Sequence, residues 1–177
     1  MKQGTKELTD GNMKLRQYTE ADIPVLYEEQ GCDPEMMHYT GWNPYATLDM
    51  TKGFVSRIIG GYAQGADDYS WFIEVDGKSI GTIGAYDYDP EQSSIEIGYS
   101  IFRENWGNGF ASQALDMVCD YLMREVGICI LKAWSAEDNV TSKRVLEKAG
   151  FHQTETKEAA INVDGVKFDQ AIYIKKD

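Results

Sequence analysis

Residues 106–112 read Trp-Gly-Asn-Gly-Phe-Ala-Ser, between a β-rich run that ends at Phe102 and an amphipathic run that begins near Gly109. Glycines let the backbone turn tightly and expose successive N–H groups with no Cβ in the way. At the start of a helix, these N–H groups and the positive end of the helix dipole together attract phosphate. The segment therefore predicts a strand-to-helix turn that binds a phosphate or pyrophosphate. A tight turn that holds no ligand is the alternative.

Other phosphate-binding loops fit this segment less well. A Walker loop needs Gly-Lys-Ser/Thr after four spacers, which residues 106–112 lack. A dinucleotide fingerprint needs a third glycine where this chain has Ser112, and it opens a first βαβ unit rather than following a fourth strand.

Hydrophobic patterning predicts the elements on either side of this turn. Asp76-Gly77 between two β-rich runs indicates a two-residue hairpin. A helix over 48–59 is expected to end at Gly60-Gly61. Strands are expected at 13–18, 69–75, 79–86, 94–102, 128–134, 151–156 and 166–175, and helices after Thr19 and at 48–59, 109–126 and 139–149. This order predicts one α/β (α+β) domain over 13–177, preceded by a flexible extension over 1–12.

The composition is that of an ordinary globular protein, with 42% hydrophobic and 26% charged residues. No apolar run approaches the ~20 residues of a membrane helix, and residues 1–7 lack the apolar core of a secretory signal. The three cysteines have no metal-ligand spacing. Together these features favour a cytoplasmic protein without a metal or a membrane partner. The formal net charge of −12 argues against nucleic acid as a partner, and it serves either solubility or the attraction of a cationic one.

Several segments together resemble the GNAT superfamily of N-acetyltransferases. They are Ile97–Ile101, residues 106–112, Asn139-Val140-Thr141-Ser142 and Glu147-Lys148-Ala149-Gly150-Phe151. Thr19-Glu20-Ala21-Asp22 and the ending over Asp169–Tyr173 are similar to the branch that includes the enzymes acetylating the N-termini of ribosomal proteins. The resemblance covers residues 13–175. It implies a mostly antiparallel sheet that is splayed at the cofactor strands and flanked by about four helices.

The resemblance also implies that acetyl-coenzyme A is the co-substrate and that a primary amine accepts the acetyl group. The acceptor is either a protein or peptide N-terminus or a small amine. The family's pyrophosphate loop, Gln/Arg-x-x-Gly-x-Gly/Ala, corresponds here to Trp106, Gly107, Asn108, Gly109, Phe110 and Ala111, with Ser112 following. Trp106 stands where Gln or Arg is usual. The backbone of Tyr99 and Ile101 is expected to pair with the pantetheine arm, and Asn139 contacts that arm or caps its own helix.

Two residues are candidates for the proton chemistry. Glu96 on the strand before the turn is the expected base for the attacking ammonium; it could instead only bind the acceptor's charge or lie on a solvated face. The family's usual Tyr acid is replaced here by Leu146. In the ribosomal-type branch a Ser takes that part, which implies that Ser142 donates a hydrogen bond to the leaving sulfur, with a plain helix-start residue as the alternative.

Aromatic residues are candidates for the acceptor pocket, since aromatic rings bind cations, although large aromatic residues more often belong to the core. The candidates are Tyr39, Trp42, Tyr45, Trp71 and Tyr86. The absence of the usual Tyr at Leu146 leaves open a second function, a non-catalytic module that binds or senses acyl-coenzyme A. A scaffold without any ligand and a homodimer are also compatible with the sequence.

Overall fold

The computed structural model describes residues 4–44, 47–64 and 67–176 of the 177-residue chain. Within these residues the strands are β1 (Leu8–Asp10), β2 (Met13–Arg16), β3 (Tyr69–Val75), β4 (Lys78–Asp89), β5 (Ser94–Ile101), β6 (Ile130–Ala136), β7 (His152–Val163) and β8 (Val166–Lys176). The α-helices are α1 (Ile23–Leu26), α2 (Pro34–Met37), α3 (Leu48–Gln64), α4 (Phe110–Asp120) and α5 (Val140–Lys148). Short 3-10 or π turns are η1 (Glu20–Asp22), η2 (Tyr27–Gly31), η3 (Arg103–Asn105) and η4 (Tyr121–Val126).

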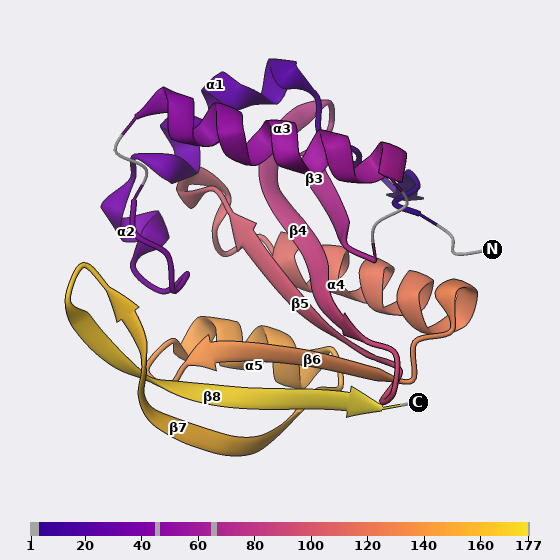
Figure 1. Ribbon diagram of the computed structural model, residues 1–177, viewed down its shortest axis with the longest axis vertical. Helices are drawn as coiled ribbons and strands as arrows, with labels where there is room; N and C mark the ends of the chain where they lie inside the picture. The colour runs from indigo at the N-terminus through magenta and orange to yellow at the C-terminus, as the bar shows by residue number, and fades with distance from the viewer. Residues whose placement is uncertain (1–3, 45–46, 65–66, 177) are drawn as a thin grey trace.

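The strands form one sheet in the order β1-β2-β3-β4-β5-β6-β8-β7. All neighbouring strands are antiparallel except β5 and β6, which are parallel and are joined through α4. Figure 1 shows α1 and α3 on one face of the sheet, and α4 and α5 on the other. This architecture confirms the predicted mixed, mostly antiparallel α/β fold. The described residues contain five α-helices instead of about four, because residues 34–37 form the short helix α2.

The core is divided by the sheet, and strand β3 illustrates how. Trp71 and Ile73 point to the side of α4 and join the larger core cluster, whereas Phe72 points the other way and joins the cluster under α3. Successive side chains of a strand alternate between faces, so a strand buried on both sides reads as a continuous apolar run. Residues 71–73 form such a run, and all three are fully buried.

The decisive feature of the sheet is the divergence of β5 from β6. The two strands pair at only three positions, Ser94↔Ile130, Ile95↔Leu131 and Glu96↔Lys132. Beyond Glu96 they separate, and Figure 1 shows the V-shaped gap between their ends. The expected splay is therefore present, and it leaves Ile97–Ile101 without a strand partner on that side.

Several boundaries differ from the sequence-based expectation, and three of the differences are substantial. α3 continues through Gly60-Gly61 to Gln64, because the Tyr62 hydroxyl donates to the Ser70 carbonyl (2.7 Å) and accepts from the Tyr18 N–H (3.0 Å), which fixes this last turn to the sheet. β7 extends from His152 to Val163. In the expected N-terminal extension, Leu8–Asp10 pair with β2 as strand β1. No described helix is both long and apolar enough to cross a membrane.

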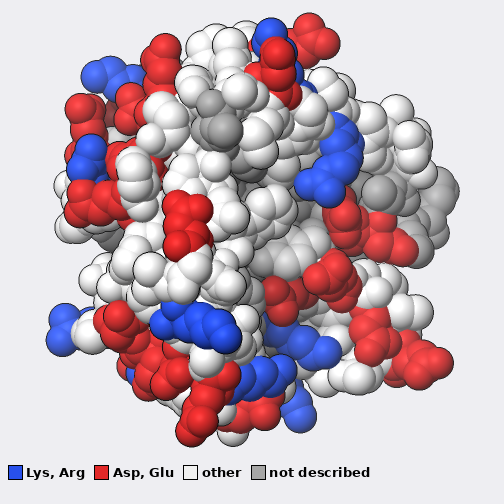
Figure 2. All heavy atoms as spheres, turned by 60° about the vertical axis from the view of Figure 1, so that its left-hand side comes forward, with Lys and Arg blue, Asp and Glu red and all other residues white. Residues whose placement is uncertain are grey.

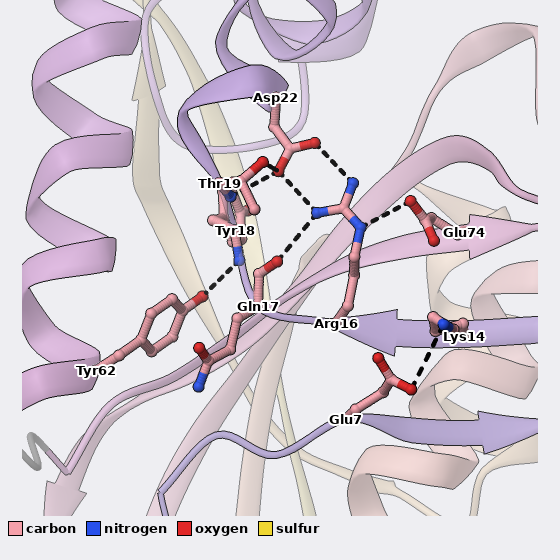
Figure 3. A network of polar contacts seen from close by, with 9 residues as sticks. All are labelled: Glu7, Lys14, Arg16, Gln17, Tyr18, Thr19, Asp22, Tyr62 and Glu74. Carbon is pink, nitrogen blue, oxygen red and sulfur yellow. Dashed lines mark hydrogen bonds and ion pairs between the residues drawn. The ribbon is translucent and has the colours of Figure 1, made fainter.

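A half-buried ion-pair network fixes the turn between β2 and α1 (Figure 3). The Arg16 guanidinium donates twice to the Asp22 carboxylate, at 2.7 Å each, and its Nε donates to Glu74 Oε1 at 2.7 Å. Asp22 also accepts from the Thr19 backbone N–H at 2.7 Å, which completes a capping box. Burial opposes ionisation of Asp22, yet the hydrogen bonds from Arg16 and Thr19 outweigh it and lower the pKa of this carboxyl.

We predict that Asp22→Asn lowers the free energy of unfolding at pH 7 by about 3 kcal/mol, since it leaves Arg16 without its bidentate partner. A carboxyl with a lowered folded-state pKa stabilises the fold above its ordinary pKa of about 3.9, and this contribution disappears as the pH falls through the folded-state value. The difference between wild type and variant should therefore shrink as the pH falls below about 3.9. Urea denaturation from pH 7 to pH 3 measures it.

Glu7→Gln is the matched control, because Glu7 pairs with Lys14 at 3.5 Å and both side chains are about half exposed. Its effect should stay within about 0.5 kcal/mol. Equal losses in the two variants would refute the role assigned to the Arg16–Asp22 pair.

Candidate active site

A cleft of about 680 Å³ runs through the gap between β5 and β6. Its lining comes from the turn after β5, the first turn of α4, α2, Trp134 of β6 and residues Tyr39, Thr40 and Trp42. Figure 2 turns this side of the molecule forward and shows a hollow whose border carries acidic side chains. The sequence-predicted residues Tyr99, Ile101, Trp106, Gly107, Gly109, Phe110, Ala111, Ser112, Asn139, Ser142, Tyr39, Trp42 and Tyr86 all line this one cleft.

The glycine turn has the geometry of an anion cradle. Gly107 and Gly109 have φ values of +78° and +80°, a conformation that favours glycine. An added Cβ at either position would meet nothing within 4 Å, so the space beside the turn is open. The first N–H groups of α4 have no acceptor within the helix. They are therefore available to an anion in the cleft.

Asn108 has a different place from its neighbours. Its side chain does not line the cleft, although the sequence suggested it as a cofactor-binding residue. The Asn108 amide instead donates to the carbonyls of Asn105 (3.1 Å) and Trp106 (3.2 Å). These two hydrogen bonds stabilise the turn.

Trp106 stands where Gln or Arg is usual, and its side chain makes a hydrogen bond of its own. Its indole Nε1 donates to the Ile101 carbonyl at 2.6 Å, while 49% of the residue remains exposed. The turn is thereby tied to the end of β5. The Ile101 carbonyl keeps only one lone pair for any other donor.

Glu96 lies at the point where β5 and β6 separate, and it faces away from α4. It accepts hydrogen bonds from Tyr86 of β4 and Trp134 of β6, both of which line the cleft. Burial raises the pKa of the Glu96 carboxyl above its ordinary value, and the nearby Asp87 charge raises it further. Glu96 itself is not among the residues that line the cleft. Trp134 was not suggested by the sequence, and only the β5–β6 pairing identifies it.

The opposite side of β5 presents hydroxyl groups. The Tyr99 hydroxyl lies 3.1 Å from Ser142 Oγ on the first turn of α5. Asn139 caps that helix, since its Oδ1 accepts from the Ser142 N–H at 3.1 Å. The expected helix cap is therefore present, and Asn139 also lines the cleft, while its contact with a cofactor arm stays a prediction.

The aromatic candidates separate into two groups. Tyr39, Trp42 and Tyr86 line the cleft, but Trp71 does not. Trp71 is fully buried on the α4 face, where its indole donates to the Lys6 carbonyl at 2.7 Å, because strand alternation points it away from the cleft. Tyr45 lies outside the described residues. Phe54 of α3 lines the cleft as well and forms an edge-on contact with Trp42.

Charged side chains at the cleft are largely paired. Glu35 lines it and accepts from Arg103 at 2.5 Å, and Arg103 also pairs with Asp33 at 3.1 Å. Tyr39 is hydrogen bonded to Asp138, and burial together with that carboxylate raises the pKa of its phenol. Among residues 4–44, 47–64 and 67–176, no three His, Cys, Asp or Glu side chains are grouped to hold a metal.

Comparisons with known proteins agree on one family. Residues 12–152 match the model of the acetyltransferase (GNAT) domain. The uncharacterized N-acetyltransferase YoaA of Bacillus subtilis is 30% identical over 161 residues, which are 90% of this chain and 90% of that protein.

Solved structures share the fold at lower identity. RimL, a ribosomal L7/L12 α-N-protein acetyltransferase solved with coenzyme A, superposes with a TM-score of 0.87 at 19% identity, over 97% of this chain and 98% of that one. A spermidine N-acetyltransferase from Vibrio cholerae, solved with coenzyme A and spermine, has a TM-score of 0.83 at 18% identity, over 94% and 96% of the two chains.

We predict that Asp87→Asn lowers the pKa of Glu96, because it removes the charge that raises it. Tyr86→Phe should raise that pKa further, since the hydrogen bond from Tyr86 favours the ionised carboxylate. A carbon-13 NMR titration of the Glu96 carboxyl measures both shifts. Shifts in the same direction for the two variants would contradict this assignment of charges.

Proposed function

This chain belongs to the GNAT acetyltransferase family, and we propose that it moves an acetyl group from acetyl-coenzyme A to a primary amine by direct attack in a ternary complex. The observation that carries the proposal is the open gap between β5 and β6 with an anion cradle at one end. A carboxylate with a raised pKa lies beside the same gap.

The cradle suits the pyrophosphate of coenzyme A. The N–H groups of Gly109, Phe110 and Ala111 are oriented by the start of α4 and need no side-chain contact. The unpaired edge of β5 near Tyr99 offers backbone groups to an amide-bearing arm. Bound acetyl-coenzyme A would supply the thioester whose carbonyl carbon is attacked. Held in this way, the two reactants gain the large advantage of orientation.

Glu96 is the proposed proton acceptor for the amine. An alkyl-ammonium with a pKa of about 10.4 is mostly protonated at neutral pH and has no lone pair for attack. A carboxylate whose pKa is raised is a stronger base than an ordinary one. Because Glu96 does not line the cleft but is hydrogen bonded to Tyr86 and Trp134, which do, the proton reaches Glu96 through a water molecule or after these side chains shift. Ser142 is the proposed hydrogen-bond donor to the leaving sulfur.

The acceptor is proposed to be a cationic primary amine. The net charge of −12 and the aromatic lining of Tyr39, Trp42 and Tyr86 both favour a cation. The RimL title names a ribosomal protein as acceptor and the Vibrio cholerae title names spermidine, so both a protein N-terminus and a small amine are candidates. A non-catalytic acyl-coenzyme A module is the second candidate, and the fully buried Leu146 at the position of the usual Tyr is the observation that favours it.

The cofactor site is tested by comparing Gly109→Ala with Gly77→Ala. Both glycines have φ near +80° and open space around an added Cβ, so both substitutions impose the same backbone strain. Only Gly109 lies at the cleft, and only its variant should bind coenzyme A more weakly, by about tenfold or more. Isothermal titration calorimetry measures the affinity. Equal affinities in the two variants, or no binding by the wild type, would overturn the site.

Acetyl transfer is tested with a panel of amines. The panel contains a peptide with a free N-terminus, the same peptide with a blocked N-terminus, and spermidine, and release of free thiol reports turnover. We expect turnover with at least one free amine and none with the blocked peptide. Glu96→Gln should lower kcat/KM by about 10²- to 10⁴-fold without changing the affinity for coenzyme A. The wild-type rate should fall on the acid side at a pH above the ordinary Glu pKa, because the pKa of Glu96 is raised.

Glu91→Gln, on an exposed turn, is the matched control and should leave kcat/KM unchanged. Binding of acetyl-coenzyme A without transfer to any amine would favour the non-catalytic module instead.

A further inference from the structure

Strand β5 carries polar groups to both faces of the sheet within four residues. Glu96 faces the side of Tyr86 and Trp134, while Tyr99 packs against the core cluster on the side of α4 and α5. Ile95 and Ile97 belong to that same cluster, which establishes the alternation along the strand. Tyr99 lines the cleft, and Glu96 is hydrogen bonded to Tyr86 and Trp134, which line it as well. A group that accepts a proton and a group that donates a hydrogen bond can therefore act on one reacting centre from opposite sides.

The Tyr99 phenol is partly buried, and its hydrogen-bond partner is Ser142. Its hydroxyl lies 3.1 Å from Ser142 Oγ and 3.4 Å from the Ser142 carbonyl. Burial raises the pKa of Tyr99 to about 12, so the phenol keeps its proton over the physiological range. When Tyr99 donates to Ser142 Oγ, the hydrogen of Ser142 must point elsewhere. Because both residues line the cleft, the Ser142 hydroxyl hydrogen can point into the cleft.

Helix α5 contains no tyrosine, so it cannot offer a phenol to the cleft beside Ser142. Leu146 is fully buried in the core, and the helix presents Thr141, Ser142 and Val145 to the cleft instead. The Asn139 side chain accepts a hydrogen bond from the Ser142 N–H, and this fixes the backbone position from which the Ser142 hydroxyl extends. Hydrogen bonds in a chain polarise one another, and a hydroxyl that accepts one becomes a stronger donor.

We propose that Tyr99 is a positioning residue that acts through Ser142: it orients and polarises the Ser142 hydroxyl so that this hydroxyl donates its hydrogen bond to the sulfur of the departing coenzyme A thiolate. The inference rests on the proposed acetyl transfer. As the amine nitrogen bonds to the carbonyl carbon, the C–S bond breaks and its electron pair stays on sulfur. The amine proton passes to Glu96, and the thiolate is stabilised by Ser142 until it leaves or is protonated by solvent.

The first test needs no turnover. The wild type is loaded with coenzyme A, and the pKa of the bound thiol is read from its S–H Raman band over a pH series. A hydrogen bond to sulfur favours the thiolate and should lower this pKa below that of free coenzyme A. Tyr99→Phe should raise it part of the way back, Ser142→Ala should raise it fully, and the double variant should match Ser142→Ala. Tyr121→Phe, whose hydroxyl bonds the Gly4 carbonyl outside the cleft, controls for the loss of a buried phenol.

The second test uses turnover with an amine that the wild type acetylates. Tyr99→Phe should lower kcat by roughly tenfold at unchanged affinity for coenzyme A, and only when Ser142 is present. A fluorinated tyrosine at position 99 should restore kcat at low pH and lose it again as the pH passes the lowered pKa of that phenol, because a phenolate cannot donate.

The outcomes separate this proposal from the proposed function. A bound thiol with the pKa of free coenzyme A, or independent effects of the two substitutions, would overturn the role of Tyr99 while acetyl transfer stands. Weaker coenzyme A binding in Tyr99→Phe at constant kcat would make Tyr99 a binding residue instead. A lowered thiol pKa in an enzyme that acetylates no amine would refute the proposed function but keep the hydroxyl pair.

Discussion

The single parallel contact in this sheet sets the arrangement of everything around the cleft. Two adjacent parallel strands need a long crossover, and here that crossover is α4, which leaves the sheet at the end of β5 and returns at the start of β6. The start of α4 consequently lies beside the free end of β5. Because β5 and β6 pair at only three positions, the sheet opens where the helix begins. The glycine turn and the gap therefore both follow from the parallel pairing of β5 with β6 through the crossover helix α4.

Strand alternation then divides the chemistry between the two faces of β5. One residue step decides whether a side chain joins Tyr86 and Trp134 or packs toward α5, and Glu96 and Tyr99 fall on different sides. The same rule removes Trp71 from the cleft. A polar group placed by a strand in this way needs partners from neighbouring elements, which Glu96 has in β4 and β6 and Tyr99 has in α5. The positions of Glu96 and Tyr99 therefore depend on the sheet more than on any loop.

The sequence was informative where local rules determine structure. Gly107 and Gly109 need a left-handed backbone, and Asp76-Gly77 likewise adopts φ values of +51° and +77°, so these turns follow from residue type. The end of α3 does not, since the cost of Gly60-Gly61 is offset by hydrogen bonds of Tyr62 to distant residues. The roles of Trp134 and Trp71 depended on which face each strand turns to the cleft, and no local pattern records that. The contact of Tyr99 with Ser142 joins residues 43 positions apart.

The glycine turn and the aromatic lining of the cleft differ in which atoms they offer a ligand. At Gly107 and Gly109 these are main-chain N–H groups, whereas Tyr39, Trp42 and Phe54 offer side chains. Main-chain recognition tolerates sequence drift as long as the two glycines remain, while each side-chain change alters the shape presented to the second reactant. Related proteins could keep the same acyl donor and take different amine acceptors after a few substitutions in α2, α3 and the segment between them. Substrate specificity can then diverge through side-chain substitutions around the cleft, while the sheet and the glycine turn stay the same.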